Sequence, residues 1–156
     1  MRQKVNTGYL QQADEGAAAQ HSFKFIKSVL LKHTNFMRNA YFSNYVEWQG
    51  DTRESFFLAQ PQAVAFMKAN PHIAMVTHSL GHRFIMDTYY GDQIQIGMTT
   101  KDILDYSVIL LFKYHHLENQ NLIGEGWQKI CFRDTLREEL CRIPPILVEL
   151  AKTIHE

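Results

Sequence analysis

The chain has 156 residues, of which 46% are hydrophobic and 21% are charged, and this balance is typical of a single globular domain. Sixteen basic and sixteen acidic side chains cancel, so the charge does not indicate a nucleic acid or an anionic membrane as the main partner. No apolar run approaches the ~20 residues that a membrane-spanning helix needs, and the N-terminus lacks the apolar stretch of a secretory signal.

The cysteines indicate a reducing compartment. Cys131 and Cys141 form no CxxC pair, and the chain has no other cysteine. This usage is typical of a cytoplasmic protein with reduced thiols. We expect both side chains to fill the core or the surface and to take no part in catalysis.

The N-terminal segment differs in composition from the rest. Residues 1–21 are polar and rich in Gln and Ala, so they predict a flexible tail, with a short helix over Gln11–Gln20 as the alternative. The folded domain is expected over residues 22–156. It begins with a β-prone stretch, Phe23–Leu31, in which apolar residues partly alternate.

A long, aromatic-rich helix is predicted next, over Ala40–Phe57. Tyr45, Gln49 and Arg53 recur every fourth residue and therefore share one line along this helix. The mostly apolar stripe beside that line marks the face expected to pack into a core; its members are Tyr41, Trp48, Thr52 and Phe56. An arginine beside a packed face needs an acid, a row of carbonyls or a ligand, so Arg53 is a candidate functional residue.

Gly50 lies inside the same helix. Glycine costs about 1 kcal/mol there relative to alanine. We expect it to permit the close approach of another backbone, with a simple kink as the alternative.

The remaining chain predicts a second helix, a run of strands and a terminal helix. Pro61 opens the short helix PQAVAFMKAN, since proline is tolerated in a first turn. Pro144 and Pro145 open a last amphipathic helix, Ile146–Ile154. The strands between them are Ile73–Ile85, with a possible bulge near Gly81, then Gln93–Ile103, Tyr106–Leu117 and Leu122–Arg133. This order predicts an α+β domain whose antiparallel sheet wraps around the one long helix.

The segment HTNFMRNAYFSNYVEW after the first strand resembles the signature HTDxxGxVYFxxYLxW of hotdog-fold thioesterases of the 4-hydroxybenzoyl-CoA thioesterase type. The matching residues are His33, Thr34, Tyr41, Phe42, Tyr45 and Trp48. The similarity extends over roughly Phe23–Ile154. It implies a hotdog fold, an antiparallel five-stranded sheet wrapped around one long central helix. Two positions depart from the signature, because Asn35 stands for its Asp and Arg38 for its Gly.

A closer resemblance is to the thioesterases of enediyne polyketide pathways, with the pattern TNxxGNVYYxNYxxWQGxxRE. The shared residues are Thr34, Asn35, Asn39, Tyr41, Asn44, Tyr45, Trp48, Gln49, Gly50, Arg53 and Glu54. The later segment GEGWQKICFRD also looks like that group's ARGRQRIACMR-like strand. If the missing Gly serves a left-handed turn or a close approach to substrate, the loop at Arg38 must be shaped differently.

The resemblance implies a thioesterase that releases a polyketide or β-keto fatty acyl chain from an acyl carrier protein, without cofactor or metal, as a homodimer or homotetramer. It implies catalytic roles for Asn35, Tyr45 and Arg53, with backbone N–H groups after Asn35 as oxyanion donors, and substrate contacts for Arg38, Asn39, Tyr41 and Gln49. An amide takes no proton near neutral pH, so Asn35 is expected to orient water or the thioester oxygen.

Other interpretations remain open from the residues alone. The chain could be a general acyl-CoA thioesterase for fatty or aromatic acyl groups, or a hotdog protein that binds acyl groups without turnover. Asn35 could be a turn residue that satisfies its own backbone, Arg53 could pair with neighbours of Glu54 or with Asp87, and Tyr45 could belong to the core.

Two further residue classes, the helix carboxylates and the histidines, could carry chemistry. Glu47, Asp51 and Glu54 are the helix carboxylates that could replace the missing Asp, but Glu47 and Asp51 are expected on a solvated outer face. The histidines do not predict a metal site: His115 and His116 are adjacent on a strand and point to opposite faces, while His78 and His82 are poorly spaced for chelation. His33 is expected to be buried and structural.

Overall fold

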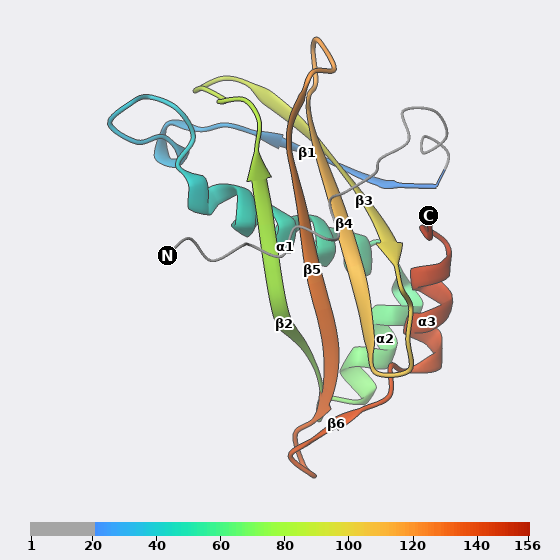
Figure 1. Cartoon of the computed structure of the whole chain (residues 1–156). Coiled ribbons are helices and arrows are strands. Elements are labelled where there is room, and N and C mark those ends of the chain that lie inside the picture. The colour runs from blue at the N-terminus through green and yellow to red at the C-terminus, as the bar shows by residue number, and fades with distance from the viewer. Residues whose placement is uncertain (1–20) are drawn as a thin grey trace, which may run out of the picture.

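The computed structural model describes residues 21–156, and Figure 1 shows how their elements are arranged. The predicted tail and its alternative helix lie outside the described residues, except for His21. The elements are β1 (Phe23–Ser28), the 3₁₀ turn η1 (Leu31–His33), α1 (Phe42–Leu58), α2 (Pro61–Ala69), β2 (Ile73–Phe84), β3 (Gln93–Lys101), β4 (Ser107–His116), β5 (Leu122–Asp134), β6 (Glu139–Cys141) and α3 (Pro145–Lys152).

The strands form one antiparallel sheet in the order β1-β3-β4-β5-β2. The short β6 pairs with β5 just beyond the point where β4 begins. In Figure 1 the sheet curves around α1, while α2 and α3 lie together at one end of the molecule. The predicted α+β fold, a five-stranded antiparallel sheet around one long helix, is confirmed.

The element boundaries differ from the predicted ones where tertiary contacts compete with local pattern. The helix α1 begins at Phe42, because the Ala40 N–H donates to the Thr88 carbonyl (2.7 Å) and Tyr41 is extended at the N-cap. The strand β1 ends at Ser28, since Leu31–His33 turns into η1. Three residues carry too little periodicity to predict β6.

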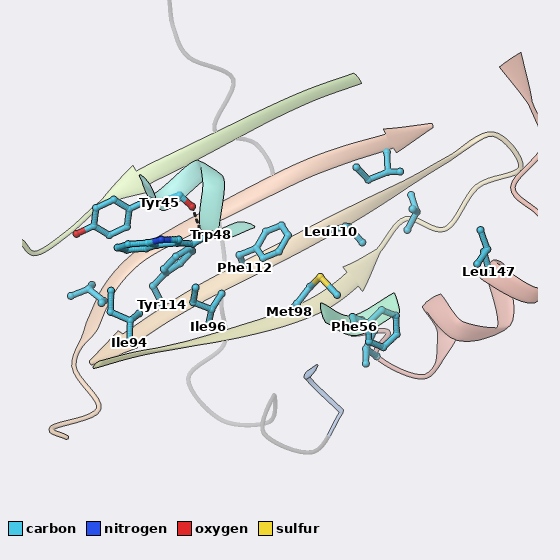
Figure 2. Packing of buried hydrophobic residues seen from close by; sticks show 14 of the residues in the cluster. Tyr45, Trp48, Phe56, Ile94, Ile96, Met98, Leu110, Phe112, Tyr114 and Leu147 are labelled. Carbon is cyan, nitrogen blue, oxygen red and sulfur yellow. Dashed lines mark hydrogen bonds between the residues drawn. The ribbon is translucent and has the colours of Figure 1, made fainter. Parts of the chain in front are cut away.

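The core lies between α1 and the concave face of the sheet. Trp48 and Thr52 are fully buried and Phe56 nearly so, as the apolar stripe predicts. Tyr41 was wrongly placed in that stripe, since it precedes the helix and is 46% exposed. Figure 2 shows an aromatic end of the core around Trp48 and an opposite end where Phe56 approaches α3.

A β-bulge decides which residues of β2 face α1. The register with β5 shifts between Thr77 and Ser79, so the bulge is at His78 and the predicted position near Gly81 is wrong. Because one residue is inserted, the concave face carries Thr77 before the bulge and His82 after it. Gly81 instead leaves room for the Trp127 ring, because a Cβ at this position would lie 2.5 Å from Nε1 of Trp127.

Gly50 does not permit a close approach within this chain. A Cβ at that position would meet nothing within 4 Å, and α1 continues through it from Phe42 to Leu58. The described residues include no helix long and apolar enough to cross a membrane.

Candidate active site

The segment 34–40, here named the motif loop, is a small closed loop before α1. Thr34 bridges to Ala40, and the Asn35 N–H donates to the Asn39 carbonyl at 3.0 Å. The Asn35 side chain forms a turn of its own, since its Oδ1 accepts the Met37 N–H at 2.8 Å. The side-chain oxygen of Asn35 therefore has the turn role that was the alternative to catalysis. Its Nδ2 donates to no other described residue.

Arg38 stands at the turn of the motif loop with φ +66°, the left-handed conformation that glycine adopts most easily. The expectation of a differently shaped loop is therefore wrong for the backbone at this position, because arginine itself takes the conformation at a cost of roughly 1–2 kcal/mol. Its side chain is exposed, as are Phe36 (100%) and Met37 (72%) beside it.

The motif loop is tied to the segment that follows β2. Nδ2 of Asn39 donates to Asp87 Oδ1 at 2.9 Å, and the Asn39 Oδ1 is buried without a partner in the described chain. The alternative in which Arg53 pairs with Asp87 is not realised, since Asp87 binds Asn39 instead. Asn44, in the first turn of α1, donates to the His33 carbonyl at 2.8 Å and anchors the loop to the helix. The His33 side chain is buried, as predicted.

The line Tyr45–Gln49–Arg53 faces the edge strand β2. Tyr45 is 3% exposed, and its ring contacts those of His82 and Phe84. Its hydroxyl lies 2.7 Å from Thr88 Oγ1. Burial raises the pKa of the Tyr45 phenol and the hydrogen bond with Thr88 opposes that rise, so the group is neutral at physiological pH.

Below Tyr45, a glutamine and a histidine are buried together. Nε2 of Gln49 donates to the Gly81 carbonyl at 3.2 Å and lies 3.4 Å from His82 Nδ1. Gln49 Oε1 and His82 Nε2 have no partner among the described residues. Burial lowers the pKa of His82 to about 4. Both side chains pack over β5 glycines, because a Cβ on Gly126 would lie 2.1 Å from Gln49 Nε2.

Arg53 connects α1 to the two neighbouring strands. Its guanidinium donates to Thr77 of β2 at 2.9 Å and to Gln128 of β5 at 3.0 Å. Its other two bonds reach one oxygen of Glu54, at 3.1 and 3.2 Å. The acid partner is thus Glu54 itself, and four of the five N–H donors of Arg53 are used.

The other helix carboxylates are arranged unlike a catalytic base. Asp51 accepts from Lys27 Nζ at 2.8 Å, and its side chain is 37% exposed, so it lies on a partly solvated face and is paired there. Glu47 is exposed, as expected. Neither contributes to the cavity described next.

A small apolar cavity of about 30 Å³ lies in the core at the α3 end of α1. Its wall includes Arg53, Phe56, Met75, Met98, Leu147 and Ile154. Arg53 lines this cavity and Asn35 does not, so the two residues do not share it. Arg53 follows Tyr45 by eight positions along α1, a distance of about 12 Å.

Solved structures resemble this one, whereas no family model and no curated protein matches the sequence. The dynemicin thioesterase is 22% identical, covers 86% of this chain and 98% of its own, and superposes with a TM-score of 0.79. A 1,4-dihydroxy-2-naphthoyl-CoA thioesterase from Synechocystis is 12% identical over 84% and 96%, with a TM-score of 0.77. A gentisyl-coenzyme A thioesterase is 16% identical over 83% and 98%, with a TM-score of 0.70. The chain has the hotdog fold.

In this hotdog domain, more residues contact the site than the sequence predicts. His82 and Thr88 join Tyr45 and Gln49, and Gln128 joins Arg53. Only the GEG run of β5 signals such an arrangement in the sequence, since paired glycines leave room on one strand face. Over residues 21–156 no three His, Cys, Asp or Glu side chains come together as a metal site.

Proposed function

We propose that this hotdog protein is a thioesterase that releases a polyketide or β-keto fatty acyl chain from an acyl carrier protein. The observation that carries the proposal is the state of Asn35, whose oxygen is held by the Met37 N–H and whose NH₂ group is left as a donor. The first turn of α1 beside it contains no acidic residue. Donors at that place suit a carbonyl oxygen that becomes negative. The polyene-binding dynemicin thioesterase supports the substrate class.

The reaction needs no carboxylate nucleophile. Water attacks the thioester carbon, and the resulting oxyanion accepts hydrogen bonds from Asn35 Nδ2 and from the Phe36 N–H, which donates to no other described residue. The carbon–sulfur bond then breaks, the thiol receives the proton lost by water, and the acyl group leaves as a carboxylic acid. A β-keto acid released in this way can lose carbon dioxide afterwards.

Tyr45 contributes by positioning the motif loop. Its hydroxyl bonds to Thr88, and the Thr88 carbonyl accepts the Ala40 N–H at 2.7 Å, so the phenol is linked to the loop by two hydrogen bonds. Gln49 is fully buried, which assigns it a supporting role beneath the site. The exposed Arg38 and Tyr41, with Asn39 between them, surround the loop where the carrier's pantetheine arm would approach.

A second copy completes the site in this proposal. The edge strand β2 is twelve residues long and exposes Val76, Leu80 and Phe84, whereas the opposite edge β1 is six residues long and carries Lys24 and Lys27. Long apolar edges pair with other strands, while lysines discourage pairing. Two β2 edges related by a two-fold axis run antiparallel, which places the first half of β2 in one copy, with Thr77, beside the second half in the other, which ends at Phe84.

This pairing brings together what one chain keeps apart. Arg53 contacts Thr77 in the first half of β2, and the motif loop is tied to the segment after Phe84. Arg53 of the second copy would therefore lie near Asn35 of the first. Its remaining N–H could hold the β-keto oxygen of the substrate. A homotetramer, two such dimers together, is compatible with the same pairing.

Mixing two inactive variants tests the composite site. Asn35→Ala and Arg53→Ala should each lose turnover of β-ketoacyl carrier-protein thioesters while they stay folded. When the two are unfolded together and refolded as a mixture, about a quarter of wild-type activity should return, because mixed dimers contain one intact site. A mixture that stays inactive would place both residues in one subunit's site.

A CoA thioesterase is the second candidate, because neighbours of this fold act on CoA thioesters and one, from Staphylococcus aureus, was solved in complex with CoA. Comparing kcat/KM for the same acyl group on CoA and on a carrier protein separates the two. Equal or higher values on CoA would refute the carrier-protein proposal. Acyl binding without turnover of either thioester would instead identify a binding protein.

A further inference from the structure

The cavity at the α3 end of α1 is the feature of the core that the proposed reaction does not use. We propose that it binds the terminal methyl segment of a straight acyl chain, with Arg53 at its polar side. The inference rests on the proposed function. Figure 2 shows Phe56, Met98 and Leu110 of the wall in one cluster, with Leu147 of α3 beside it.

The lining favours an apolar guest. Except for Arg53 and Thr100, the wall residues are hydrophobic, and Thr100 Oγ1 already donates to the Ala151 carbonyl at 2.6 Å. A volume of about 30 Å³ would hold about two water molecules, but water needs several polar partners to stay. Apolar cavities remain dry and bind apolar groups for that reason.

The position of Arg53 connects the cavity to the reaction. This residue is the last member of the line that faces β2, its side chain is 16% exposed, and it forms part of the cavity wall. An acyl chain whose polar head lies at the guanidinium can therefore continue directly into the apolar space of the same subunit. The charged group would mark the boundary between the polar and apolar parts of the substrate.

The wall can adapt to guests of different length. Met75 and Met98 line the cavity, and unbranched methionine side chains refit easily. The α3 side is held by backbone bonds, since the Thr100 N–H donates to the Ile154 carbonyl at 2.9 Å. A narrow cavity with one adaptable wall suits a straight chain and excludes a rigid aromatic acyl group.

Two opposite changes on α3 test the inference. Ala151→Val adds two methyl groups at the cavity, and Leu147→Ala enlarges it. Ile146→Ala is the control, because Ile146 belongs to the same helix and packs against the core without lining the cavity. The measurement is kcat/KM for hexanoyl, decanoyl and hexadecanoyl thioesters, with circular dichroism to confirm folding.

We expect Ala151→Val to lower kcat/KM by about tenfold for the longest thioester that both the variant and the wild-type protein hydrolyse. Its kcat/KM for the hexanoyl thioester should be unchanged. Leu147→Ala should move the preference to longer chains, and Ile146→Ala should leave the profile unchanged. An active enzyme with the same chain-length profile in both cavity variants would overturn the inference alone. A wild-type chain without thioester turnover would overturn the proposed function.

Binding provides a readout independent of turnover. Decanoate should raise the Tm of the wild-type protein more than that of Ala151→Val, since apolar contacts in the cavity stabilise the folded state. If either α3 variant fails to fold, the other still reports on the cavity. An equal Tm increase in wild type and Ala151→Val would place the chain elsewhere.

Discussion

Acidification should destabilise this protein through His82, whose imidazole is buried beside Gln49 and three aromatic rings. Burial lowers the pKa of His82 from 6.5 to about 4, so the folded state holds the ring neutral where the unfolded chain would protonate it. The unfolded state therefore binds more protons between those values. The stability that the neutral His82 ring contributes is complete above pH 6.5 and is lost as the pH falls towards 4.

The magnitude follows from the pKa difference. At about 1.4 kcal/mol for each pKa unit, a fall from 6.5 to about 4 amounts to roughly 3 kcal/mol as an upper limit. Urea unfolding, followed by tryptophan fluorescence at fixed protein concentration, measures the free energy of unfolding at several pH values from 7 to 4. His82→Gln should remove most of this pH dependence, whatever its effect on stability at pH 7.

Two controls separate His82 from the other histidines. His33 also has a pKa lowered by burial, but its contribution is common to both proteins and cancels in the comparison. His78→Gln changes an exposed ring at the bulge and should leave the wild-type slope intact. If wild type and His82→Gln lose stability in parallel between pH 6.5 and 4, the reasoning from burial is refuted.

Four further changes test the core and the site. Gly126→Ala should destabilise the fold, because its Cβ would overlap Gln49 Nε2 at 2.1 Å. Gly50→Ala should stabilise the fold by about 0.5–1 kcal/mol, because a Cβ there meets nothing within 4 Å. Urea unfolding measures both changes. Tyr114→Phe removes the 2.6 Å bond to the Tyr45 carbonyl and should cost about 1 kcal/mol in the same assay. Asp51→Asn should keep kcat within about twofold, because this half-exposed ion pair only joins α1 to β1; complete loss of turnover would restore a carboxylate mechanism.

The fold could be predicted because its pattern is local and repeated. Alternation of apolar residues along Gln93–Lys101 and the four-residue spacing in α1 each fix which face is buried, and both predictions were right to within two or three residues. The bulge could not be placed in the same way. One inserted residue at His78 changes no composition, yet it decides that His82 faces the helix.

The candidate site shows the same division. The motif around Asn35 and the spacing of Tyr45, Gln49 and Arg53 are visible in the sequence, since they depend on neighbours in one helix and its preceding loop. Their partners are not. Thr77, Thr88 and Gln128 reach these residues across separations of 24 to 75 positions, which no local pattern encodes.

By itself the amino-acid sequence determined the helix, the strands and the residues that one helix face presents. Tertiary structure alone decided which of those residues are paired, which stay free to donate, and where the core is left unfilled. The reason is physical: periodicity acts over a few residues, whereas burial and hydrogen bonding depend on what the folded sheet brings opposite each side chain.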